Sequence, residues 1–225
     1  MNVKELNANS NIIDFPSSVD ADGLERYIKH NSQHLLQESG YQSENTFFIS
    51  GNAALSVIPN NIVNIVFGGY NNSSLTNLSF SNYTFNQLES IVIGNSSFKD
   101  AKIDVVFSGL PKLKSLVIGS ECFQNATSFL IEGLSSLETV KIGSQCFYID
   151  GYGYYSYLKS FHIINCNQLL EILIGSYCAS ASHCKIFDLI NLNSLKSIKM
   201  ENNCFSGIES FVIQSTLLVS QGIMN

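Results

Sequence analysis

The sequence contains no tryptophan, only three prolines and few charged residues. Of its 225 residues 13% are charged, whereas about a quarter is usual in globular proteins. Because 45% of the residues are hydrophobic, the chain has enough apolar surface to fold, which excludes a disordered tail or an acidic linker. The net charge of -6 disfavours a nucleic-acid-binding protein that relies on phosphate contacts.

Long hydrophobic runs are also missing. No apolar segment approaches the roughly 18–20 residues that span a bilayer, and residues 1–10 lack the basic and then apolar order of a secretory signal. We therefore expect no membrane span and a cytoplasmic location. In that compartment the six cysteines are expected to be reduced thiols rather than a disulfide framework.

The main feature that is present is an internal repeat. A seven-residue segment with apolar residues at its first, fourth and sixth positions occurs six times. The six copies span residues 62–68, 88–94, 113–119, 137–143, 169–175 and 195–201. All end in glycine except the last, which ends in Glu201, and successive copies are 26, 25, 24, 32 and 26 residues apart.

A second repeated motif lies halfway through each period, at residues 105–110, 128–134, 160–166, 185–192 and 210–214. Both motifs alternate apolar and variable positions, which is the period of a β-strand, and Gly, Asn and Ser lie between them as turns require. Stacking such coils buries apolar ladders that one coil could not bury alone. The sequence predicts a mainly β solenoid with two short strands per coil of about 24–26 residues, stacked in parallel.

The pattern L-x-x-I-x-I-G-x-x-C/S-F, over residues 58–213, resembles a leucine-rich repeat. It is most similar to the BspA-like, or Treponema pallidum-type, class that is found in protists. The small residue followed by Phe appears as Ser97 with Phe98, Cys122 with Phe123, Cys146 with Phe147 and Cys204 with Phe205, and Cys178 with Ala179 is a degenerate copy. The resemblance implies a curved solenoid that binds other proteins and implies no catalysis. The pattern lacks the usual Asn at its ninth position, so an asparagine ladder is not expected.

The segments outside the repeats differ in character. Residues 1–16 are expected to be flexible, and residues 17–58 to form an N-terminal α/β cap with a helix over 20–38 and a strand at 47–49. The solenoid of about six coils then covers 59–213. Residues 214–225 either fold back over the last coil or leave an open edge, which would invite self-association or mark a solenoid that was once longer.

The longest period contains a tyrosine-rich insertion at residues 148–157. Its repeat holds eight residues more than the 24-residue period before it. Tyr and Gly are favoured in binding loops, so Tyr152, Tyr154 and Tyr155 are candidates for contact with a partner, a carbohydrate or another small ligand. The alternative is an elongated turn whose rings pack on the neighbouring coil.

The candidate binding face is the outer side of the first strand in each coil. Its third position is Asn64, Ser90, Ser115, Thr139, Glu171 or Ser197, and its fifth is Val66, Val92, Val117, Lys141, Leu173 or Lys199. We predict an exposed, flat, partly apolar strip from Val66 to Val117, continuing to Leu173, because contiguous exposed apolar surface often marks an interaction site. The alternative is that β-branched residues are there because they favour strands.

Catalytic chemistry is not indicated. The cysteines at 122, 146, 178 and 204 share one motif position and are expected to stack as small buried hydrophobes. A metal column there lacks paired C-x-x-C spacing, and His30 and His34 lack a third ligand. A reactive thiol at Cys184 and an undetected hydrolase stay open as minor alternatives.

We therefore predict no catalytic, cofactor or metal site. The predicted function is a non-enzymatic scaffold that binds a protein partner on the sheet face and does not bind nucleic acid. The alternatives are a self-assembling structural protein that stacks through its C-terminal end, and a carbohydrate or small-ligand binder that uses the tyrosine-rich loop.

Overall fold

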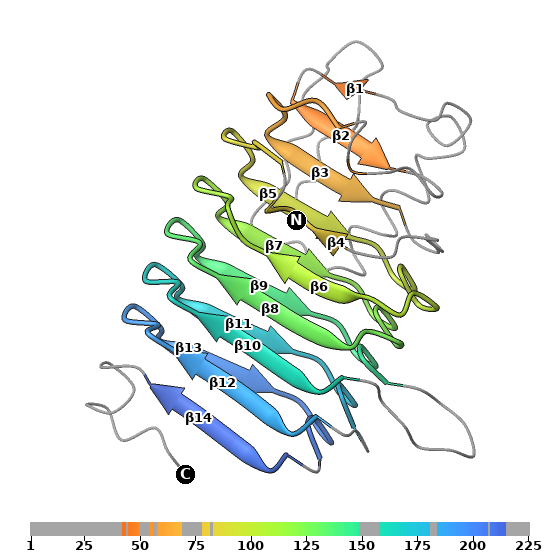
Figure 1. Ribbon diagram of the computed structural model, residues 1–225, viewed down its shortest axis with the longest axis vertical. Helices are drawn as coiled ribbons and strands as arrows, with labels where there is room; N and C mark the ends of the chain where they lie inside the picture. Colours follow the sequence, from red (N-terminus) through yellow and green to blue (C-terminus); the bar gives the residue numbers. More distant parts are fainter. Residues whose placement is uncertain are drawn as a thin grey trace, which may run out of the picture.

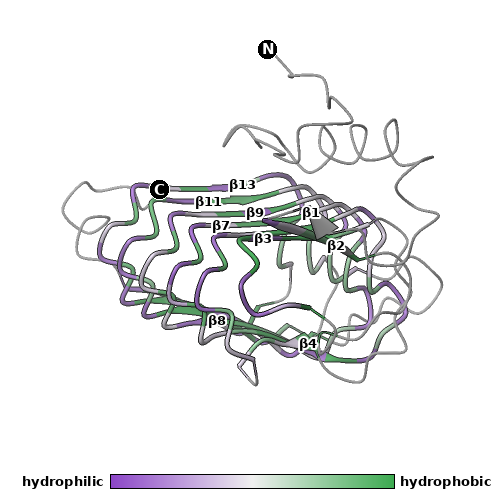
Figure 2. Cartoon of the chain, turned by 90° about the horizontal axis from the view of Figure 1, so that it is seen from above, coloured by the Kyte–Doolittle hydropathy of each residue, from purple (hydrophilic) through white to green (hydrophobic). Residues whose placement is uncertain are grey.

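The computed structural model describes residues 42–43, 45–49, 55, 58–68, 78–81, 83–148, 158–180, 184–206 and 208–214. These residues form a β-solenoid of about 5 turns of roughly 26 residues, in which two sheets of mainly parallel strands lie on opposite sides of each coil (Figures 1 and 2). The predicted mainly β solenoid with two strands per coil is therefore confirmed. The helix predicted over 20–38 and the insertion at 148–157 lie outside the described residues, apart from Tyr148.

The first-motif strands form the larger sheet, called sheet A. In spatial order it contains β1 (Gln42–Ser43), β2 (Thr46–Ile49), β3 (Asn64–Phe67), β5 (Ser90–Ile93), β7 (Ser115–Ile118), β9 (Thr139–Ile142), β11 (Glu171–Ile174) and β13 (Ser197–Met200). Only β1 runs antiparallel to its neighbour. Strand β2 lies inside the segment expected to be a cap, yet it pairs in parallel with β3 and so extends the sheet.

The second-motif strands form the other sheet, called sheet B. It contains β4 (Leu78–Ser79), β6 (Asp104–Phe107), β8 (Ser128–Glu132), β10 (Ser160–Ile164), β12 (Ile186–Ile190) and β14 (Ser210–Gln214), each parallel to the next. Strand β4 was not predicted, since the copies of the second motif that are recognised in the sequence begin at residue 105. In both sheets equivalent motif positions pair, as Val92 does with Val117, because each coil repeats the same spacing.

Apolar side chains at alternate strand positions fill the space between the sheets. In sheet B one Phe on each of β8, β10, β12 and β14 forms a ladder, with ring centroids of Phe129 and Phe161 4.7 Å apart and those of Phe161 and Phe187 5.1 Å apart. A second ladder, in the turn after sheet A, places the rings of Phe98 and Phe123 5.3 Å apart. Such contacts between coils replace a single globular core.

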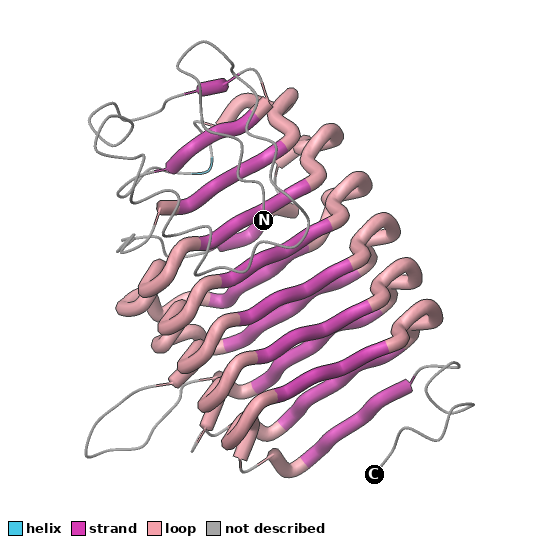
Figure 3. The backbone as a smooth tube through the Cα atoms, turned by 180° about the vertical axis from the view of Figure 1, so that it is seen from behind, coloured by secondary structure: helices cyan, strands magenta, loops and turns pink. Residues whose placement is uncertain are grey.

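The turns after β5, β7, β9, β11 and β13 have a repeated backbone (Figure 3). Two residues per turn have positive φ, namely Ser96 and Phe98, Glu121 and Phe123, Gln145 and Phe147, Tyr177 and Ala179, and Asn203 and Phe205. The glycine before the turn lies against the preceding coil. A Cβ atom on Gly143 would be 2.5 Å from the Ser120 nitrogen, so a side chain at this position would force the coils apart.

The thiol at the shared cysteine position links each coil to the one before it. Cys122, Cys146, Cys178 and Cys204 donate from Sγ to the carbonyl oxygens of Gly94, Gly119, Gly143 and Gly175, at 3.2, 3.0, 3.0 and 3.0 Å. In the earlier coil Ser97 donates to Gly68 in the same way, at 3.0 Å. A column of four thiols and one hydroxyl thus forms hydrogen bonds between the coils at this motif position.

Candidate protein-binding surface

The outer face of sheet A brings the predicted partner-binding residues into two columns. Strand pairing aligns Ser90, Ser115, Thr139, Glu171 and Ser197 in one column and Val66, Val92, Val117, Lys141, Leu173 and Lys199 in the other. Both columns point away from the core, because the residues between them belong to the apolar core cluster and they do not. The predicted geometry of the face is therefore confirmed.

The predicted exposure of the valines is wrong. Val66, Val92 and Val117 have exposed fractions of only 1%, 5% and 7%, although none of them belongs to the core cluster. On the outer face of β3, β5 and β7 the valine column is therefore buried, whereas Asn64, Ser90 and Ser115 beside it remain half-buried. A partner cannot reach the valine side chains on the surface as it stands, and the accessible part of their column begins at Lys141 on β9.

Over β9, β11 and β13 the same face is open. Lys141 and Leu173 are half-buried and Lys199 is exposed, so one column places an apolar side chain between two basic ones. Glu171 lies beside this column, and its carboxylate is 3.6 Å from the Lys199 ammonium. Thr139 donates to the hydroxyl of Ser115 at 3.3 Å and so is held by the sheet.

The cysteines do not provide a reactive site. All six are described, none forms a disulfide, and all except Cys204 are buried, which confirms their predicted packing role. Burial raises the pKa of the Cys184 thiol to about 11, and it also raises the pKa of Cys146 well above its ordinary value. Since the thiolate is the nucleophile, burial and a raised pKa disfavour the suggested reactivity of Cys184.

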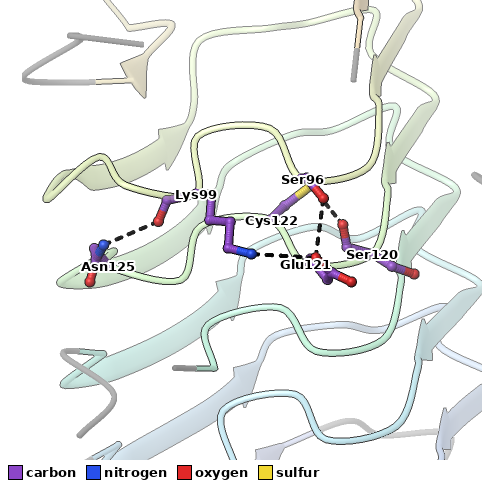
Figure 4. A network of polar contacts seen from close by, with 6 residues as sticks. All are labelled: Ser96, Lys99, Ser120, Glu121, Cys122 and Asn125. Carbon is purple, nitrogen blue, oxygen red and sulfur yellow. Dashed lines mark hydrogen bonds and ion pairs between the residues drawn. The ribbon is translucent and has the colours of Figure 1, made fainter. Parts of the chain in front are cut away.

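A polar network on the turns joins neighbouring coils (Figure 4). The Ser96 hydroxyl donates to the Glu121 carboxylate at 3.2 Å, and the Lys99 ammonium lies 3.5 Å from the same carboxylate. Asn125 donates to the carbonyl oxygen of Lys99 at 3.2 Å. Each of these contacts joins one coil to the next, so the network serves the stacking of the solenoid.

On the outer face of sheet B, His162 and Asp188 form a pair that we did not predict. The His162 Nδ1 atom lies 3.1 Å from a carboxylate oxygen of Asp188, and the two residues are directly paired on β10 and β12. They are 26 residues apart, which is one period, so the spacing could have revealed the pair. The predicted outward direction of His162 is confirmed by its partial exposure.

The remaining predictions concern the tyrosine-rich loop, metal sites and membrane-spanning helices. Tyr152, Tyr154 and Tyr155 lie outside the described residues. Within the described ranges, no group of three or more His, Cys, Asp or Glu side chains is arranged to hold a metal ion. No helix in that part of the chain is long and apolar enough to cross a bilayer.

Comparison with protein-family models, with curated proteins and with solved structures finds no match for this chain. The class of protein that the fold defines is a parallel β-solenoid repeat protein.

Proposed function

We propose that the chain is a non-enzymatic scaffold of the leucine-rich-repeat type, related to the BspA-like class, that binds a protein partner on the outer face of sheet A. The binding surface is the face of β9, β11 and β13. The observation that supports it is the column in which half-buried Leu173 lies between Lys141 and Lys199 on a rigid parallel sheet.

The composition of this surface indicates the chemistry of the partner. An accessible apolar side chain framed by charged ones is typical of an interface, in which the apolar contact supplies affinity and the charges select the partner. The two lysines favour a partner that carries carboxylates on either side of an apolar side chain. Glu171 lies beside Lys199 and offsets part of its charge, so a carboxylate of the partner is favoured mainly at the Lys141 end of the column.

The proposal is tested with one change on the proposed face and a matched change on the opposite sheet. Leu173→Glu places a charge in the centre of the proposed surface. Leu130→Glu is the control, because Leu130 is also half-buried and faces outward, but from β8 in sheet B. Both variants are first checked for native circular dichroism and an unchanged unfolding midpoint.

The readout is quantitative affinity capture from the source cell, followed by direct titration of the captured protein. We expect Leu173→Glu to weaken the titrated affinity at least about tenfold, as for a change at the centre of an interface, and Leu130→Glu to leave it unchanged. Equal affinity of the folded Leu173→Glu variant and the wild type would show that the partner does not use this face.

A further inference from the structure

The valine strip, which consists of Val66, Val92 and Val117, is buried although it lies on the outer face of sheet A and outside the core cluster. The described neighbours of Val92 on that face do not account for its burial. Across the sheet it lies between the other two valines, and along its own strand between Ser90 and Gly94, whose side chains are small or absent. A further part of the chain must therefore cover the strip.

Leu173 provides a comparison within the same column. Its neighbours across the sheet are Lys141 and Lys199, and Glu171 lies on the same side of its own strand. These side chains are larger than those around Val92, yet Leu173 is half-buried and Val92 is only 5% exposed. The additional cover therefore ends before Leu173.

The cover is most complete at the N-terminal edge of the sheet. The exposed fraction is 1% at Val66 on β3 and 7% at Val117 on β7, and Lys141 on β9 is already half-buried rather than buried. Strands β1 and β2 form the edge next to β3 (Figure 1). Residues 1–41 directly precede β1 and are the longest stretch outside the described residues, so they join the solenoid where the cover is most complete.

The other long stretches outside the described residues are less suited to this position. Residues 215–225 follow β14 at the opposite end of the solenoid, and the outer face of the last three strands of sheet A lies open between. Residues 149–157 belong to the coil of β9, where the column is also open. Residues 69–77 have to connect β3 with β4 in the other sheet, and their only large apolar side chains are Tyr70 and Leu75.

Residues 20–38 have the composition that such a cover requires. Helical spacing places four large apolar side chains on one side, those of Leu24, Tyr27, Ile28 and Leu35. A helix of this length extends about 28 Å, whereas β3 and β7 lie two strand spacings, or about 10 Å, apart. The segment is therefore long enough to cross the whole valine strip.

We propose that residues 20–38 lie across the outer face of β3, β5 and β7, with this apolar side against the valine strip of the same chain. The contact withholds the strip from any partner. Its consequence for binding rests on the proposed function: the partner-binding surface is confined to β9, β11 and β13, and release of the segment would lengthen that surface. The contact itself does not depend on the proposed function.

The first test measures access to the valine strip through the labelling rate of an introduced thiol. Val92→Cys and Leu173→Cys are each made in the full chain together with Cys204→Ser, because Cys204 is the one cysteine that is not buried. With a water-soluble maleimide we expect Val92→Cys to react at least about tenfold more slowly than Leu173→Cys, since a thiol must be accessible to react.

A charge on the apolar side of the segment should remove this protection. Ile28→Glu should raise the labelling rate of Val92→Cys at least about tenfold, because a carboxylate is disfavoured against an apolar strip. Gln33→Glu is the matched control, since it adds the same charge on the opposite side of the predicted helix and should leave the rate low. An unchanged rate with Ile28→Glu, or equal acceleration by both changes, would overturn the proposal.

Global unfolding is distinguished from loss of the cover in the same set of variants. Because the valines do not belong to the core cluster, Ile28→Glu should leave the circular dichroism of the solenoid and the labelling rate of Leu173→Cys unchanged. If Ile28→Glu instead accelerated labelling at both thiols equally, the protection of Val92 would not come from a local cover, and the proposal would be wrong.

The second test identifies the segment that covers the strip. Ser115 is half-buried beside Val117, so Ser115→p-benzoylphenylalanine places a photo-reactive group at the margin of the cover in the full chain. After irradiation we expect mass spectrometry to find links to residues 20–38 within one chain. Links only to residues 69–77, to residues 215–225 or to a second chain, or no links to 20–38, would overturn the assignment. Neither test uses a partner, so their failure is distinguishable from failure of the proposed function.

Discussion

The thiol of Cys146 donates a hydrogen bond to the carbonyl oxygen of Gly119, one coil earlier in the solenoid, across 3.0 Å. Both the thiol and its neighbourhood are closed to solvent. A buried carbonyl oxygen that lacks a donor lowers the stability of the folded state. A small side chain that can donate is therefore favoured at this position, because it stabilises the stacking of the coils.

Replacing Cys146 tests the contribution of the thiol as a donor. Cys146→Val keeps an apolar side chain but removes the donor, and we expect the free energy of unfolding in urea to fall by about 1–3 kcal/mol. Cys146→Ser keeps a donor, as Ser97 does against Gly68, and should cost less than Cys146→Val. Equal losses in the two variants would show that the hydrogen bond adds no stability.

Gly143 is required by its distance from the preceding coil. In Gly143→Ala the new Cβ atom would lie 2.5 Å from the backbone nitrogen of Ser120, and backbone cannot move aside without separating the coils. We expect a loss of about 3 kcal/mol or more, measured by urea unfolding.

Gly175 repeats the measurement, since it occupies the same motif position as Gly143. A Cβ atom there would be 2.6 Å from the Ser144 nitrogen. Gly175→Ala should therefore cost about as much as Gly143→Ala. A small loss in both variants would argue against close approach of the coils as the reason for the glycine.

Gln145 has a backbone conformation that suits asparagine better. Its φ is 59°, in the left-handed region that asparagine adopts more readily than glutamine. We expect Gln145→Asn to raise the free energy of unfolding by about 0.5 kcal/mol, seen as a higher thermal midpoint. Asn203 occupies the equivalent position with φ 60°, so Asn203→Gln should have the opposite effect.

Asp104 makes the stability depend on pH in the acid range. The hydroxyls of Ser128 and Thr127 donate to its carboxylate and lower its pKa below the ordinary value of 3.8. A carboxylate with a lowered pKa in the folded state adds stability that is present above the unfolded pKa and is lost as the pH falls through the folded pKa.

The Asp104→Asn variant isolates this contribution. We expect the wild type to be more stable than Asp104→Asn at neutral pH and the difference to shrink as the pH falls below 3.8. Urea unfolding of both proteins at a series of pH values measures it. A difference that stays constant down to the acid limit would show that Asp104 does not titrate with folding.

Much of the fold was predictable because its information is local and repeated. The period-two alternation around Ile91 and Leu116 is sufficient to place two strands, and the regular spacing places them side by side. The packing of Cys146 followed from its recurrence at one motif position. By contrast, positive φ at Phe98 and Phe123 has no sequence signal, because bulky residues rarely adopt that conformation.

The candidate surface was predictable only in its direction. The alternation along each strand shows that Val92 and Leu173 point away from the core, and the structure agrees. It does not show that Val92 is buried while Leu173 is half-exposed, because the exposed fraction depends on everything that packs against a face, whatever its distance in sequence. The contact between His162 and Asp188 required the register of β10 and β12.

The sequence by itself determined that this protein is a stack of similar coils with two strands each, since the repeat and its alternation act within a few residues. Only the tertiary structure decided that Val92 and Val117 are buried on the outer face whereas Leu173 and Lys199 stay accessible. The physical reason is that solvent exposure is a property of the assembled surface. Identical motif positions such as those of Val66 and Lys199 therefore have different surroundings once the coils are stacked.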